Sequence, residues 1–122
     1  MEDSDMLSIS QEPDVLAARL AVRGAARRMG FALTDQARFV MTADELTHSL
    51  LAHTGRGNLT IRVLHDGERR GLELVCEEFP TPEARTLAHL WPQGHASRMM
   101  DEVHLEQAVN GARRIVCRRW LA

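Results

Sequence analysis

The chain has 122 residues and a mass of 13.7 kDa, which is enough for one domain with its own hydrophobic core and too little for two. Fifteen basic and 17 acidic residues leave a formal net charge of −2, so no overall field attracts nucleic acid or an anionic membrane. No apolar run approaches the roughly 20 residues that cross a bilayer, and the acidic start MEDSD is unlike a secretory signal. These features predict a cytoplasmic protein with neither nucleic acid nor membrane as a partner.

Two amphipathic helices are predicted in the first half of the chain, after a short strand over residues 6–9. The stretch 13–29 starts with a proline, which suits a first helical turn, and repeats apolar residues at spacings of three and four. Gly30 is expected to end this helix. Thr34 is the expected N-cap of a second helix that runs to about Ala52.

The polar residues of the second helix are not scattered. Thr42, Glu45 and Ser49 fall three and four positions apart, so they share one face beside the apolar stripe. Glycines in the segment 55–58 then end the helix.

The second half of the chain predicts strands. Residues 59–64 and 72–77 alternate in polarity around an Asp-Gly pair, which is a hairpin signal, although the loop that reaches Gly71 is longer than a two-residue turn. A strand over 103–107 and a last strand over 115–120 form the second predicted hairpin.

Two more helices and a turn complete the predicted order of elements. The helices cover residues 83–90 and 96–102, and Asn110 and Gly111 make the tight turn. The order indicates an α/β (α+β) two-layer sandwich, with a mixed, mostly antiparallel sheet and helices on one face. Residues 1–12 form an N-terminal segment and residues 13–122 the domain.

Cysteines and histidines offer no strong site. Cys76 and Cys117 lie in separate predicted strands and are expected to be free buried thiols; a redox pair requires those strands to be neighbours. The histidine spacings are five and six residues, whereas two ligands on one helix face are four apart, so no metal site is predicted. The closest pairs are His48 with His53 and His89 with His95.

Arginines gather near the last strand and at the tip of the first hairpin. With no tyrosine and few other aromatic residues among them, they are expected to solvate a sheet edge or to face an acidic protein partner. Leu87, Leu90 and Trp91 are a candidate apolar contact patch, with a core position as the alternative for Trp91. The arginines are Arg69, Arg70, Arg113, Arg114, Arg118 and Arg119.

A resemblance joins these elements to a known family. Residues 43–51 (ADELTHSLL) resemble the asparagine box of the histidine-kinase-like, GHKL-type ATPase fold, also called the Bergerat fold. More narrowly, they look like the small serine kinases and anti-sigma factors of bacterial partner-switching systems. Residues 14–19, 30–31, 96–102 and 119–120 share this likeness, which covers nearly the whole chain.

The resemblance assigns candidate site residues on the second helix. Glu45 matches the glutamate that orders or deprotonates the attacking group. The asparagine that holds Mg²⁺ in the family is Ser49 here, and its hydroxyl is shorter and lacks the carbonyl oxygen that suits a hard cation. The alternative for Glu45 is a solvated carboxylate that pairs with Arg38 or His48.

The other nucleotide motifs depart further from the family pattern. In the Asp-x-Gly-x-Gly box, Glu77 stands for the adenine-binding aspartate, and Phe79 and Thr81 replace the glycines, so the Phe79 ring is expected to fill the pocket or point into the core. The lid segment 89–95 keeps one glycine, and the family's late Gly-Thr reads AR at 112–113. Neither ATP nor another cofactor is therefore expected to bind.

Three functions follow from this resemblance. The preferred one is a degenerate regulatory module, a pseudokinase, that docks a sigma factor, a STAS-domain anti-anti-sigma protein or another copy of itself. The first alternative is an active, divergent serine kinase with ATP and Mg²⁺, in which Glu45 is the base and Glu77 holds the adenine. The second alternative is a structural dimerisation subunit.

Overall fold

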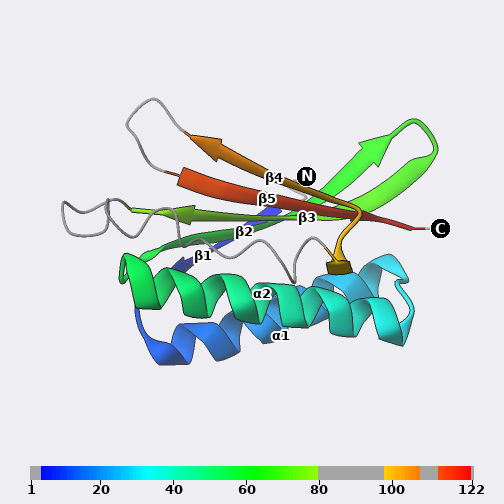
Figure 1. Cartoon of the computed structure of the whole chain (residues 1–122). Helices are drawn as coiled ribbons and strands as arrows, with labels where there is room; N and C mark the ends of the chain where they lie inside the picture. The colour runs from blue at the N-terminus through cyan, green and yellow to red at the C-terminus, as the bar shows by residue number, and fades with distance from the viewer. Residues whose placement is uncertain (1–3, 80–97, 108–112, 122) are drawn as a thin grey trace.

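The computed structural model describes residues 4–79, 98–107 and 113–121. Within these residues, two helices cover one face of a five-stranded sheet (Figure 1). The predicted two-layer α/β fold is therefore confirmed. The predicted helix over 83–90, the turn at 110–111 and the candidate patch of Leu87, Leu90 and Trp91 lie outside the described residues.

Helix α1 (Glu12–Met29) follows the predicted bounds closely. Pro13 lies in its first turn, and the Asp14 carboxylate accepts a hydrogen bond from the Gln11 backbone N–H at 3.1 Å, which satisfies a donor at the positive end of the helix. Gly30 ends the helix with φ +93°, a left-handed conformation that glycine adopts without strain.

Helix α2 (Leu33–His53) begins before Thr34, so the predicted N-cap is wrong. Ala32 holds the N-cap position with an extended backbone. No side chain caps this end, and the Gln36 side-chain Nε2 donates to the Phe31 carbonyl at 2.9 Å. This buried amide holds the short connection between the two helices.

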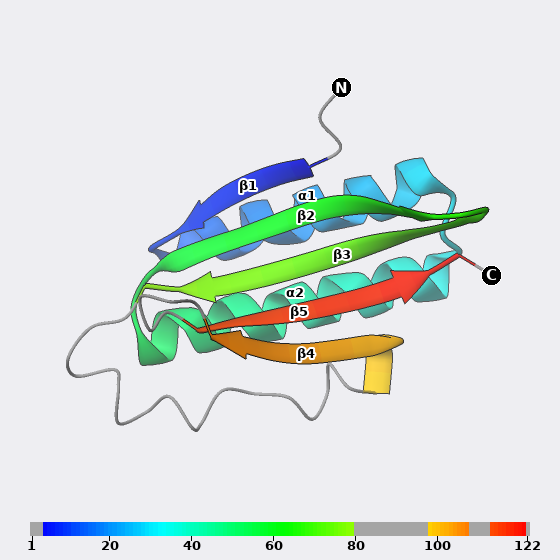
Figure 2. The same cartoon turned by 90° about the horizontal axis from the view of Figure 1, so that it is seen from above.

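The sheet has the strand order β1-β2-β3-β5-β4, and all four pairings among the described strands are antiparallel (Figure 2). The mostly antiparallel sheet that the sequence predicts is thus confirmed. The strands are β1 (Ser4–Ile9), β2 (Gly57–Asp66), β3 (Arg69–Glu78), β4 (Glu102–Gln107) and β5 (Arg113–Trp120).

The hairpin between β2 and β3 is tighter than the sequence indicates. Asp66 pairs directly with Arg69, which leaves only Gly67 and Glu68 in the turn. Gly67 has φ +65° and Glu68 has no positive φ, the combination found in type II′ hairpins. The expected longer loop is wrong because the backbone ladder continues through polar residues, where the apolar alternation has already stopped.

The predicted helix over 96–102 is wrong at its end. Arg98 and Met99 are helical, but Glu102 begins β4. Glu102 pairs with Arg118 in the ladder, and its carboxylate accepts a hydrogen bond from Trp120 Nε1 at 2.8 Å. These cross-strand contacts favour the extended conformation.

The hydrophobic core fills the space between the sheet and the two helices. Phe31 and Phe39 pack edge to face within it, with ring centroids 4.9 Å apart. Cys76 and Cys117 lie on neighbouring strands, yet both are free and buried, as the sequence predicts, and burial raises the pKa of Cys117 to about 12. No helix in the described ranges is both long and apolar enough to cross a membrane.

Candidate functional site

The polar face of α2 carries the first candidate residues. Thr42 is buried and its hydroxyl donates to a carbonyl one turn earlier at 2.8 Å, which is a structural role. Glu45 is half-buried, and its charge helps to raise the pKa of Cys117 after the larger effect of burial. Ser49 Oγ lies 3.0 Å from Nδ1 of His53.

The two bases expected beside Glu45 have other carboxylates as neighbours. Arg38 Nη1 lies 2.7 Å from Oδ1 of Asp35. His48 Nδ1 lies 3.4 Å from Oδ1 of Asp44. Each of these bases thus has a carboxylate neighbour other than Glu45, and His48 has a second one at 3.7 Å, Glu12 of α1.

Glu77 lies on the other face of the sheet from Glu45 and Ser49. Side chains alternate along a strand, and Cys76 faces the helices with its Sγ 3.9 Å from the Leu46 carbonyl oxygen. Glu77 therefore points to the open face, where its carboxylate lies 3.8 Å from Nη1 of Arg114. The structure thus does not bring together the three residues that the sequence assigns to one nucleotide site.

Glu78 is the carboxylate that returns to the helix side of β3. It is 4% exposed, and Arg113 Nε donates to its Oε1 at 3.0 Å. The sequence analysis missed this residue, although counting by two from Cys76 would have found it. With Glu78 in the aspartate position of the family motif, the two glycine positions are Pro80 and Pro82.

Phe79 directly follows the end of β3, a strand that lies between β2 and β5 in the sheet. Its backbone N–H donates to the Arg56 carbonyl at 3.1 Å, and the Arg56 guanidinium lies 5.7 Å from the ring centroid. The ring is half-buried and is not one of the buried core residues. The expectation that it points into the core is wrong, because a cation–π contact holds it at the end of the strand.

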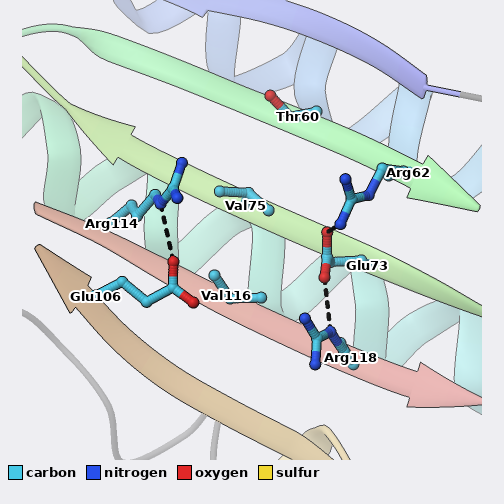
Figure 3. A pocket seen from close by; sticks show the side chains of 8 residues that line it. All are labelled: Thr60, Arg62, Glu73, Val75, Glu106, Arg114, Val116 and Arg118. Atoms are coloured by element: carbon cyan, nitrogen blue, oxygen red, sulfur yellow. Dashed lines mark hydrogen bonds and ion pairs between the residues drawn. The ribbon is translucent and has the colours of Figure 1, made fainter. Parts of the chain in front are cut away.

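The open face of the sheet holds a network of ion pairs (Figure 3). Glu73 on β3 is 1% exposed and lies 2.8 Å from Nη2 of Arg62 on β2 and 2.6 Å from Nε of Arg118 on β5. Arg114 Nε lies 3.0 Å from Oε1 of Glu106 on β4. The strands thus place opposite charges side by side, in rows that cross the sheet.

An open cavity of about 310 Å³ lies between these charged rows. Its floor is formed by Thr60, Val75 and Val116, which come from three adjacent strands (Figure 3). Arginine and glutamate side chains form its walls, and their charges are largely paired with one another.

The arginines of β5 do not lie on a sheet edge, so that prediction is wrong. β5 runs between β3 and β4, and its arginines meet carboxylates from three sides. The hydrogen bond from Arg118 to Glu73 raises the pKa of the guanidinium. The pairs are Arg113 with Glu78, Arg114 with Glu106, Arg118 with Glu73 and Arg119 with Asp35.

Metal ligands do not converge in the part of the chain that the structure describes. No group of three or more histidine, cysteine, aspartate and glutamate side chains there is arranged to hold an ion. The chemistry available at the described positions is thus that of paired charges and of Glu45 on its helix.

Comparisons with known proteins indicate the class of protein to which this chain is similar. No protein-family model matches the chain. A chain in the crystal structure of the SiaB–SiaC complex from Pseudomonas aeruginosa shares the fold, with a TM-score of 0.58 and 10% identity over 97% of this chain and 89% of that one. Serine/threonine-protein kinase RsbT of Bacillus subtilis (strain 168) is 26% identical over 99% of both chains. This full-length similarity confirms the resemblance to the anti-sigma factor and switch-protein serine kinase family.

Proposed function

We propose that this chain is a regulatory module of a bacterial partner-switching system that binds other proteins and does not turn over ATP. The relation to a switch kinase supports the regulatory role, and the structural neighbour was crystallised as a protein complex. The partner in this proposal is a sigma factor or a STAS-domain protein, with a second copy of the chain as the alternative. The module acts in the cytoplasm.

The buried pair of Glu78 and Arg113 is the observation that carries the absence of ATP turnover. The family's carboxylate at this strand end holds the adenine amino group, which requires an oxygen that a ligand can reach. Glu78 is almost fully buried and already accepts a hydrogen bond from Arg113. Separating a buried ion pair leaves an uncompensated charge and costs about 3–5 kcal/mol. Adenine would have to compete with this pair.

Two further features support the same conclusion. Ser49 takes the place of the Mg²⁺-binding asparagine, and its hydroxyl already lies at hydrogen-bond distance from His53. The chain has no glycine between Gly71 and Gly94, where the family needs backbone that approaches the base closely. The charge of a triphosphate would lack its metal and its cradle of backbone amides.

Calorimetric titration of the purified chain with ATP and ADP, with and without Mg²⁺, tests this proposal. We expect no heat of binding at high micromolar protein. Saturable binding that depends on Mg²⁺ would overturn the proposal. If binding is seen, Glu78→Gln and Glu77→Gln tell which carboxylate takes part, because the two side chains lie on opposite faces of the sheet.

A second candidate function, an active and divergent serine kinase, is favoured by the full-length similarity to RsbT and by the half-buried Glu45 on α2. In this function Glu45 is the base, and Glu45→Ala abolishes phosphoryl transfer from Mg-ATP to a purified STAS-domain protein. Ser49→Asn, which restores the family's metal ligand, is the matched variant and should raise the rate. Transfer with this pattern would put the kinase first.

A further inference from the structure

The helix surface that faces away from the sheet carries an apolar patch. Four of the six large apolar side chains that are exposed in the described ranges lie on it, each between 55% and 75% exposed. Spacings of four on α1 and eight on α2 align each pair on one side of its helix. Two of the four, Leu33 and Met41, line one groove together, which indicates a contact surface. The four are Leu16 and Leu20 on α1, and Leu33 and Met41 on α2.

A groove of about 280 Å³, the outer helix groove, runs along this surface where α2 meets α1. From Leu33 to Met41 it follows eight positions of α2, about 12 Å along the helix axis. That length matches the separation between residues i and i+7 of a docked helix. The groove is lined by Arg23 of α1 and by Leu33, Gln36, Ala37, Val40 and Met41 of α2.

The α1 rim of the groove is positively charged. Every charged residue of α1 after Asp14 is an arginine. Arg19 is neutralised by Asp44, whose Oδ1 lies 2.6 Å from its Nε. Arg23 and Arg27 lie on the same side of α1 as Leu16 and Leu20, and both are exposed. No carboxylate in the described parts of the chain lies within ion-pair distance of either, so the rim is complementary to acidic side chains.

Gln36 contributes a polar side chain to the floor of the groove. Its side chain is 7% exposed, and its Nε2 is used by the Phe31 carbonyl. Its Oε1 accepts no hydrogen bond within the described part of the chain. Because this oxygen is buried, a docked partner does not reach it, and Gln36 serves the groove as part of its floor.

We propose that the outer helix groove docks an acidic amphipathic helix of a partner protein. Apolar side chains of that helix pack on Leu33 and Met41, and its acidic residues pair with Arg23 and Arg27. The proposal deepens the function given above, on which it rests only for the partner being a regulatory protein. It names the surface and the chemistry of that partner.

Fluorescence anisotropy of the full chain with two labelled synthetic helices tests the docking. The first is an 18-residue peptide with leucines at spacings of three and four and glutamates on both flanks; the second has lysine at every glutamate position. We expect the acidic peptide to bind about tenfold more tightly, and this preference to shrink as salt is added. Equal affinity for both peptides, or no binding of either, would refute the proposal.

Matched variants locate the binding surface. Met41→Glu places a charge in the groove and should weaken binding of the acidic peptide about tenfold or more, whereas Met6→Glu, on exposed β1, should leave it unchanged. Arg23→Glu should weaken it about fivefold. Leu33→Glu, at the most exposed of these positions, should weaken binding in the same way and replaces Met41→Glu if that variant lowers the melting temperature.

Two outcomes separate the groove from its alternatives. If wild-type chains dimerise in light scattering, Met41→Glu is monomeric and the acidic peptide does not bind, the groove is a self-association surface and the proposal is wrong. Peptide binding that Met41→Glu leaves intact is also contrary to it. Nucleotide titration is independent, since Mg²⁺-dependent ATP binding would overturn the proposed function without changing the result at the groove.

Discussion

Helices α1 and α2 cover one face of the sheet, whereas the opposite face is covered by its own long side chains (Figures 1 and 3). On the helix side, Leu59, Leu74 and Ile115 are fully buried by apolar contacts. On the open side, Glu73 is almost equally buried because Arg62 and Arg118 close over it from the neighbouring strands. Burial in a strand therefore does not by itself tell which face meets the core.

The two faces should differ in how they stabilise the chain. The helix side depends on the area removed from water and on close packing, so it is sensitive to lost volume. The open side depends on pairing, in which the aliphatic stems of arginine cover surface and the charged ends remain partly in water. Single substitutions on each face test whether the two faces stabilise the chain in these different ways.

The largest effect is expected for Phe39→Ala on the helix side. Phe39 is fully buried and packs against Phe31, so removing its ring should lower the free energy of unfolding by about 3–5 kcal/mol. Urea denaturation followed by circular dichroism measures this loss. Met41→Ala on the same helix is exposed and should change stability by about 0.5 kcal/mol or less. Equal losses for both would show that the helix layer is not packed as described.

Glu73→Ala tests the open face and should cost about 2–3 kcal/mol. It leaves Arg62 and Arg118 without their shared carboxylate, but water reaches both guanidinium groups, whose side chains are 53% and 30% exposed. The cost is therefore below that of breaking a fully buried pair. Glu106→Ala removes a carboxylate that is 44% exposed and should cost about 1 kcal/mol or less. Urea midpoints at low and high salt measure both losses. A loss of no more than about 0.5 kcal/mol for Glu73→Ala would mean that the ion pairs of Glu73 with Arg62 and Arg118 do not stabilise the fold.

Gly71→Ala should cost about 1–2 kcal/mol by forcing atoms apart on the open face. A Cβ there would lie 2.7 Å from Cε3 of Trp120 and 2.9 Å from the Arg119 carbonyl oxygen, so backbone must shift. Thermal unfolding measures the loss. Gly24→Ala in α1 is the opposite control, since its Cβ meets only the flexible end of Arg28 at 3.1 Å and alanine favours helix. A stable Gly71→Ala variant would mean that both the Trp120 ring and the β5 backbone at Arg119 move aside at little cost.

The sequence predicts the helix side of this molecule better than its open side. Periodic apolar residues are local signals, and they place both helices and the buried positions Leu72, Leu74 and Cys76 correctly. From the sequence alone, Glu73 would be predicted to be a solvent-exposed strand residue. Its arginine partners lie on other strands, and which strands are neighbours is decided by the whole fold. The position of β5 between β3 and β4 likewise depends on the whole fold and cannot be predicted from local sequence.

The candidate site shows the same limit. Matching motifs residue by residue put the adenine carboxylate at Glu77, whereas strand alternation puts Glu78 on the helix side with Arg113. A shift of one residue moves a side chain to the other face of a sheet, so motif spacing alone does not decide between neighbours. The prediction of Thr34 as the N-cap failed because the helix begins at Leu33, after Ala32, with no side chain capping it, so the threonine signal is not used.

The smallest effect concerns Glu102, at the border of the open face. The hydrogen bond from Trp120 Nε1 holds the pKa of this carboxyl below its ordinary value, with smaller contributions from His104 and Arg118. A carboxyl with a lowered pKa stabilises the fold above its unfolded pKa, and that contribution is lost as the pH falls through the folded pKa. Trp120→Phe keeps a ring but removes the N–H, so an NMR titration of Glu102 should show its pKa rising toward the ordinary value.

The helix side should respond to pH in the opposite direction, which makes the titration a test of the two faces. Cys117 stabilises the fold as a thiol below its ordinary pKa of 9.0, and this contribution is lost as the pH rises toward about 12. Urea midpoints from acid to alkaline pH should therefore fall at both ends. Trp120→Phe should weaken only the acid limb. Cys117→Ala should weaken only the alkaline limb, part of which remains because burial also raises the pKa of the Cys76 thiol. If Trp120→Phe leaves the pKa of Glu102 unchanged, Arg118 and His104 hold the carboxylate, and the open face is organised by charge alone.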